Sequence, residues 1–173
     1  MADSQTFPKL FVLYMLRQAD FPVTGSHIDE CLLNGDYISY FDLKAALDEL
    51  ARSGLIRAQS RGTITYYTIT AVGQDTLAPL AGDIPASIQT DIRAFMKENR
   101  ERMRDESSVF AEYERQSNGE YEVRCRAVEN NSDLIRLSIT VPDEDQARTA
   151  CLRWVTRCQP IYEFVMQNLL SQA

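Results

Sequence analysis

Few side chains in the sequence have the types and spacing that catalysis or metal binding requires. His27 is the only histidine, and the cysteines Cys31, Cys125, Cys151 and Cys158 form no C-x-x-C pair. A structural zinc site needs four such ligands at close spacing. The sequence also has no phosphate-binding glycine loop and no nucleophile beside a base. We therefore expect no enzyme activity, metal or cofactor, reduced and mostly buried thiols, and a solvent-facing His27.

The residues from Ser39 to Thr63 could instead bind a partner. If residues 40–53 form a helix, steps of 100° per residue place one polar face opposite the apolar stripe. A basic side chain in such a face could contact DNA phosphates, whereas an acidic one repels them unless it accepts from a cytosine amine. The candidate DNA-binding residues are Ser39, Phe41, Lys44, Ala45, Asp48, Arg52, Arg61 and Thr63.

Local signals define the helix and the hairpin that must position these residues. Ser39-x-x-Asp42 is an acidic capping box, and Gly54 stands where a left-handed cap ends a helix. Strands are expected over 55–60 and 63–70, joined by Arg61-Gly62, with Gly62 supplying a positive φ. The buried helix stripe is Leu43, Ala46, Leu47 and Leu50.

Two helices are expected before this stretch and one after it. The first begins near Thr6 and ends before Asp20-Phe21-Pro22, because the residue before proline avoids the α region. The second begins after Thr24 or Ser26 and ends near Asn34. Thr70 can cap a further helix that ends at Gly82.

The second strand of the expected hairpin ends in a sequence motif, which we consider together with the order of the helices and strands. The pattern begins with Gly54-Leu55-Ile56 and closes with Y-x-x-T-x-x-G at Tyr67, Thr70 and Gly73. Over roughly residues 7 to 80, this resembles the winged-helix transcription regulators of the PadR and MarR types. The resemblance implies a recognition helix, 40–53, in the DNA major groove and a wing, 60–63, on the backbone. The whole chain also resembles a two-domain bacterial family of unknown function, which implies an architecture and no activity.

The second half of the amino-acid sequence predicts a helix, three strands and a final helix. A long helix is expected over 84–105, strands over 109–116, 120–129 and 134–141, and a helix after Asp143. Pro160 either kinks that helix or starts a new one. Its inner face is expected to include Val155 and to continue through Tyr162, Val165 and Leu169. The predicted fold class is α+β, with a winged helix-turn-helix domain over 1–82 and an α-β-β-β-α domain over 83–173.

Charged and aromatic side chains in the second half have ordinary structural interpretations. Lys97, Arg100, Arg102 and Arg104 are expected on a solvated helix face, paired with neighbouring glutamates of the same helix. Acidic and basic residues on the outer face of the sheet can pair across strands. Tyr113, Tyr121 and Trp154 are candidates for a small-effector pocket, and the alternative is that they form ordinary core.

The charge balance limits the functional hypotheses. The net charge is −7, and residues 1–82 carry 6 basic against 9 acidic side chains. A monomer with a few phosphate contacts would bind DNA weakly, so a DNA-binding transcription regulator must act as a homodimer. The alternative is a protein interaction or assembly module that does not read DNA, with Tyr40 and Phe41 as contacts. Without a signal peptide or membrane span, we expect a cytoplasmic location.

Overall fold

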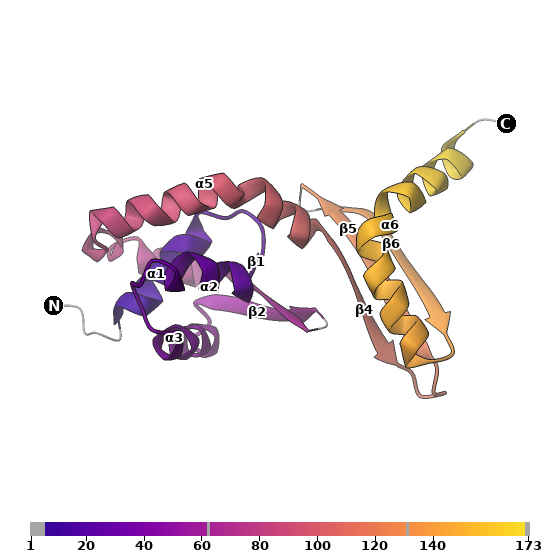
Figure 1. Cartoon of the computed structure of the whole chain (residues 1–173), viewed down its shortest axis with the longest axis horizontal. Helices are drawn as coiled ribbons and strands as arrows, with labels where there is room; N and C mark the ends of the chain where they lie inside the picture. The colour runs from indigo at the N-terminus through magenta and orange to yellow at the C-terminus, as the bar shows by residue number, and fades with distance from the viewer. Residues whose placement is uncertain (1–5, 62, 131, 172–173) are drawn as a thin grey trace. The chain divides into compact units, whose positions relative to one another are not determined.

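The structure is a computed structural model that describes residues 6–61, 63–130 and 132–171. It contains α-helices and two three-stranded antiparallel sheets, which confirms the α+β class. The chain divides into two compact units, with the boundary between Ser107 and Ser108. Each unit has its own hydrophobic cluster. Figure 1 shows the helices and strands of the chain.

The N-terminal unit contains five α-helices and one sheet within its described residues. The sheet has the strand order β1-β3-β2, with Ala58 of β2 opposite Tyr67 of β3. The predicted turn at Gly62 lies outside the described residues. The elements are α1 (Thr6–Arg17), β1 (Val23–Thr24), α2 (Gly25–Leu33), α3 (Tyr40–Arg52), β2 (Ile56–Arg61), β3 (Ile64–Ile69), α4 (Ala71–Leu77), a 3-10 turn η1 (Ala81–Asp83) and α5 (Ala86–Ser108).

Helix α1 is the centre of this unit. All seven residues from Leu10 to Leu16 are at most 3% exposed, so the helix is covered on every side. It packs against α2, α3, α4 and β3. A helix that is apolar all round belongs in a core, and the other elements are arranged around it.

Helix α5 belongs to the N-terminal unit, whereas the sequence placed the boundary after residue 82. Its buried side chains Ile92, Met96 and Met103 join the same hydrophobic cluster as α1. Arg100 also donates hydrogen bonds to the carbonyl of Gln18 and to Asp20, at the end of α1. The amphipathic pattern of α5 identified its buried face, but not the core against which that face packs.

The Y-x-x-T-x-x-G motif joins α3, β3 and α4. The Thr70 hydroxyl donates to the carbonyl oxygen of Gly54 at 2.7 Å and accepts from the Gly73 amide at 3.1 Å. It thereby caps α4 and satisfies a carbonyl at the end of α3. Gly73 allows close approach, because a Cβ there would overlap the Leu55 carbonyl oxygen.

The C-terminal unit is a meander of three strands with one helix against it. Its elements are β4 (Val109–Arg115), β5 (Tyr121–Glu129), β6 (Ser132–Val141) and α6 (Glu144–Leu170), and β5 is the central strand. Cross-strand ion pairing is confirmed, because Arg124 contacts Glu112 and Glu114 on β4. Arg126 and Arg136 stand opposite each other and share Asp133, and their hydrogen bonds lower the pKa of that carboxyl.

Helix α6 continues through Pro160 and packs on the sheet mainly through its N-terminal half (Figure 1). Ala147, Trp154 and Cys158 are buried there. The prediction that Val155 and Leu169 share this buried face is wrong, since they are 58% and 75% exposed. Val155 is rotated by about 100° from buried Trp154, whereas Leu169 lies in the part of the helix that follows Cys158, the last of its buried residues.

Replacing Gly73 tests the packing at the end of the motif. We expect Gly73→Ala to lower the free energy of unfolding by about 1–3 kcal/mol, because the new methyl group clashes with the Leu55 carbonyl. Gly82→Ala is the matched control, because a Cβ there meets no atom within 4 Å. Urea denaturation measures both, and equal stability of the two variants would contradict this packing.

Candidate nucleic-acid interface

Helix α3 presents the predicted binding face to solvent. Ser39 caps the helix by accepting from the Asp42 amide, and the four apolar stripe residues are buried. Phe41 is 82% exposed, and Ser39, Ala45, Asp48 and Arg52 are also exposed, while Lys44 is half-buried. The spacing of apolar and polar residues along α3 therefore gives the helix one side in the core and one side open to solvent.

A groove lies between α3 and the β2–β3 hairpin. Its volume is about 480 Å³, and it is lined by Lys44, Ala45, Leu47, Asp48, Ala51, Ala58 and Tyr67. Three of the predicted binding residues, Lys44, Ala45 and Asp48, thus lie together on one wall. Burial raises the pKa of the Tyr67 phenol on the other wall, so its hydroxyl remains protonated at neutral pH.

The cations of the α3 face contact carboxylates. Lys44 Nζ donates to both carboxylate oxygens of Asp29 on α2, at 2.8 and 3.0 Å. Arg52 pairs with Asp48 one turn away at 2.9 Å. Such exposed pairs contribute about 0–1 kcal/mol. A phosphate could therefore replace the carboxylate at little energetic cost.

Arg61 lies on the opposite side of the hairpin from α3. Its guanidinium donates to the Ser107 carbonyl at 3.2 Å and stacks over the Tyr66 ring at 4.5 Å. Tyr66 is buried and donates to the Glu106 carbonyl. Because side chains alternate along a strand, Arg61 and Tyr66 share the sheet face turned toward α5, whereas Ala58 and Tyr67 face α3. The structure therefore places Arg61 and Lys44 on opposite sides of the hairpin. Thr63 is exposed and lies between β2 and β3.

Sequence reasoning missed two parts of this region. Strand β1 has only Val23 and Thr24, too short for an alternating pattern, and it pairs with Tyr67 and Tyr66. Tyr67 and Ala58 were not named as groove residues, although the register of the hairpin aligns them opposite each other. Period-two alternation from buried Ile56 was the signal that could have found Ala58.

The prediction that His27 faces solvent is wrong. The residue is 4% exposed, and its Nε2 lies 2.5 Å from Glu106 Oε2 on α5. The outer side of α2 is covered by the end of α5, which the sequence had assigned to the other domain. Glu30, 3.7 Å from His27 Nδ1, also accepts from Arg102. His27 is therefore a packing contact between α2 and α5.

The predicted pairing of the basic residues within α5 is also wrong. Arg100 and Arg104 bind Asp20, and Arg102 binds Glu30. These acids belong to other segments of the N-terminal unit. These ion pairs hold α5 against that unit, and Arg102 also donates a hydrogen bond to Asn99 on its own helix.

The three candidate effector residues pack in the core of the C-terminal unit. Trp154 is 3% exposed and its Nε1 donates to the Arg126 carbonyl at 3.0 Å. The rings of Tyr113 and Tyr121 contact each other edge to face at 6.0 Å, and both pack against the cluster that contains Trp154. Tyr113 also donates to Glu144. This arrangement favours the core interpretation over a pocket.

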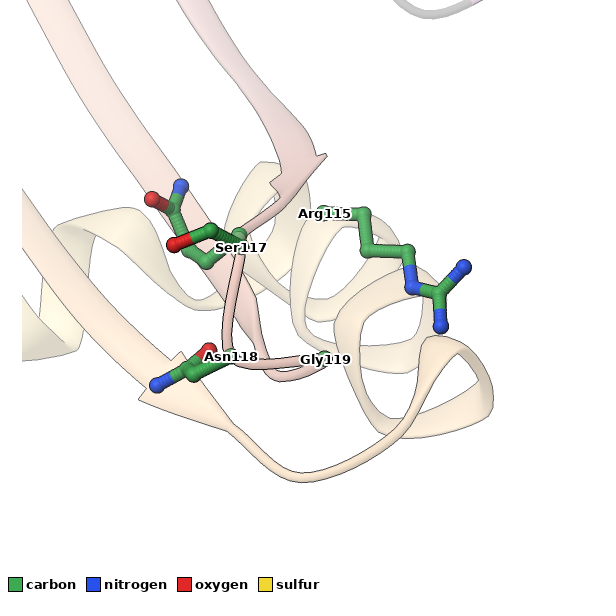
Figure 2. A pocket seen from close by; sticks show the side chains of 5 residues that line it. Arg115, Ser117, Asn118 and Gly119 are labelled. Atoms are coloured by element: carbon green, nitrogen blue, oxygen red, sulfur yellow. The ribbon is translucent and has the colours of Figure 1, made fainter.

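A larger hollow, of about 550 Å³, lies at the turn between β4 and β5 and is lined by Arg115 to Gly119. Figure 2 shows the Arg115 guanidinium extending away from the Ser117 and Asn118 side chains. The polar groups diverge, whereas a ligand site needs convergent ones.

The cysteines are free thiols in mostly buried positions. Cys31, Cys125 and Cys158 are buried, and Cys151 is half-buried. Burial raises the pKa of Cys31 to about 12 and that of Cys125 to about 11, which disfavours the reactive thiolate. In the described part of the chain, no group of three or more histidine, cysteine or acidic residues could hold a metal ion.

Together these features define an α+β protein with an open helix-and-hairpin face and a separate sheet-and-helix unit. Residues 8–169 match the family described as Domain of unknown function (DUF4364), and the chain belongs to this family. The match extends across both units. Neither the curated proteins nor the solved structures give a match. Among the described residues, no helix has both the length and the apolar character needed to cross a membrane.

Replacing the single tryptophan tests whether the aromatic residues form core. We expect Trp154→Phe to lower the free energy of unfolding by about 1–3 kcal/mol, because it leaves a void and removes the donor to Arg126. Phe164→Ala, at a position 66% exposed on the same helix, should change it by less than about 0.5 kcal/mol. Denaturation followed by circular dichroism measures both. Wild-type stability of Trp154→Phe would contradict a packed ring.

Proposed function

We propose that this protein is a DNA-binding transcription regulator of the winged-helix type that acts as a homodimer. In this proposal α3 enters the major groove, and the hairpin between β2 and β3 contacts the DNA backbone. Its contact residues are those named from the sequence on α3, together with Arg61 and Thr63 at the hairpin.

The observation that supports the proposal most strongly is the order and pairing of elements around α3. Three helices precede a two-stranded hairpin, the short β1 pairs with that hairpin, and α3 leaves one face open beside it. This arrangement is typical of a winged helix, in which the third helix reads the groove. The buried α1 supplies a rigid support for α3.

The carboxylates beside the cations determine how such binding would work. Asp29 competes with phosphate for Lys44, and Asp48 competes for Arg52. DNA binding must exchange these carboxylates for phosphates, so affinity per subunit is low and falls steeply with salt. Arg61 must leave the Ser107 carbonyl to reach the backbone. Two subunits double the number of contacts, which is why the proposal includes a dimer.

Removing Asp29 and removing Lys44 should change DNA affinity in opposite directions. We expect Asp29→Asn to tighten binding to the protein's own upstream DNA by about two- to five-fold, because it frees Lys44 for a phosphate. Lys44→Ala should weaken binding and reduce the slope of log affinity against log salt by about 0.9 for each phosphate that the side chain neutralises. Fluorescence anisotropy across a salt series measures both.

Two charge-matched variants serve as controls for this titration. Asp75→Asn on α4 and Arg93→Ala on α5 change the net charge equally at exposed positions outside the α3 face. The DNA proposal fails if the α3 variants behave like these controls and random DNA binds as well as upstream DNA.

Exposed aromatic residues favour a second candidate, a protein interaction module. Phe41 is 82% exposed and Tyr40 is 54% exposed, and their rings pack edge to face at 5.8 Å. Aromatic side chains are enriched at protein interfaces. An acidic chain with exposed aromatic residues on α3 is suited to a basic protein partner.

A photocrosslinking residue can distinguish the two candidates. With a benzophenone amino acid in place of Phe41, irradiation in cells should give a product that nuclease digestion shortens if α3 binds DNA. A product that only protease digestion shortens would favour the protein candidate. The same residue in place of Val72, which is 59% exposed on α4, is the control for nonspecific crosslinking.

A further inference from the structure

Helix α6 has a second apolar stripe in addition to the one that covers the sheet. Its positions follow alternating steps of three and four residues, which is the heptad spacing of paired helices. None of its six side chains is charged. The stripe is Leu152, Val155, Gln159, Tyr162, Met166 and Leu169.

The second stripe is separate from the sheet-facing one. At 100° per residue, its centre lies about a quarter of a turn around the helix from Ala147, Trp154 and Cys158. Leu152 is 70% exposed and Leu169 is 75% exposed, while the sheet-facing residues are buried. The C-terminal unit therefore covers one side of α6 and leaves the adjacent side open.

The exposed area matches what a stable dimer needs. A large apolar side chain has about 150–200 Å² of surface when fully exposed, so the stripe and adjacent Leu170 expose on the order of 500 Å² of apolar surface. A standard interface buries roughly 800 Å² per partner, somewhat more than half of it apolar. The stripe together with Leu170 supplies about that apolar share.

We propose that a second copy of this chain packs on this stripe, so that two α6 helices pair along it. A 3-4 apolar pattern is self-complementary, because the side chains of one helix enter the spaces between those of an identical helix. Over the described residues, the exposed large apolar side chains of the other elements are scattered on α3, β3, α4, β6 and the loop after α4. None of these described side chains forms a second helical stripe to cover α6.

Gln159 gives the pairing its register. It is the one polar residue within the stripe, and its amide donates to Glu163 on the same helix at 2.9 Å. A single polar residue in an apolar seam lowers the stability of a helix pair but excludes shifted alignments. The inference rests on α6 alone. It supplies the dimer that the proposed function requires without depending on DNA binding.

Light scattering after size exclusion tests the pairing without DNA. The wild-type chain of 19.7 kDa should give twice that mass at micromolar concentration. Leu169→Glu and Leu152→Glu should give monomers with unchanged circular dichroism, whereas Leu134→Glu, at an exposed position on β6, should stay dimeric. Gln159→Leu should lower the dimer dissociation constant several-fold, which provides a test even if an acidic variant misfolds.

A wild-type monomer up to about 100 µM would overturn the inference, and would indicate that the stripe is covered by another part of the chain or by a different partner. A dimer that Leu134→Glu dissociates and the stripe variants do not would overturn it as well. A dimer that depends on the stripe but does not bind upstream DNA would support the inference and count against the proposed function only.

Discussion

Complete burial of α1 is the constraint on which the N-terminal unit depends. Its seven consecutive apolar residues are removed from water only if other elements cover every side of the helix. α2, α3, α4 and β3 provide that cover, and α5 adds its own side chains to the same cluster. One consequence is functional: α3 places its apolar stripe against this core and leaves its other face open beside the hairpin.

The same open face explains why shape and charge indicate different strengths of binding. The topology around α3 is suited to a DNA groove, but each cation of the α3 face already contacts an acidic partner. An exposed ion pair contributes little, so it does not prevent phosphate binding. In the proposed function it lowers the DNA affinity of each subunit, so that contacts from two subunits would have to compensate. The C-terminal unit is relevant here, because α6 has one apolar side on the sheet and another side open.

Local patterns predicted most elements, and the failures concern contacts between distant segments. The capping box at Ser39 and the stripe of α3 could be recognised because caps and helical periodicity depend on neighbouring residues. The burial of His27 could not, because it depends on Glu106, 79 residues further along the chain. The unit boundary was misplaced for the same reason, since amphipathicity does not show which core a helix covers. Of the residues predicted to bind DNA, Lys44, Ala45 and Asp48 meet in the groove, whereas Arg61 lies on the other side of the hairpin.

The most direct test of the account is to locate the surface that upstream DNA contacts. Amide hydrogen exchange of the full chain, with and without a duplex of its own upstream sequence, reports this segment by segment. The account predicts slower exchange confined to α3 and the β2–β3 hairpin, with exchange in β4 to β6 unchanged. The account would be contradicted if exchange became slower in other segments but not in α3. It would also be contradicted if exchange did not change anywhere at DNA concentrations that saturate binding.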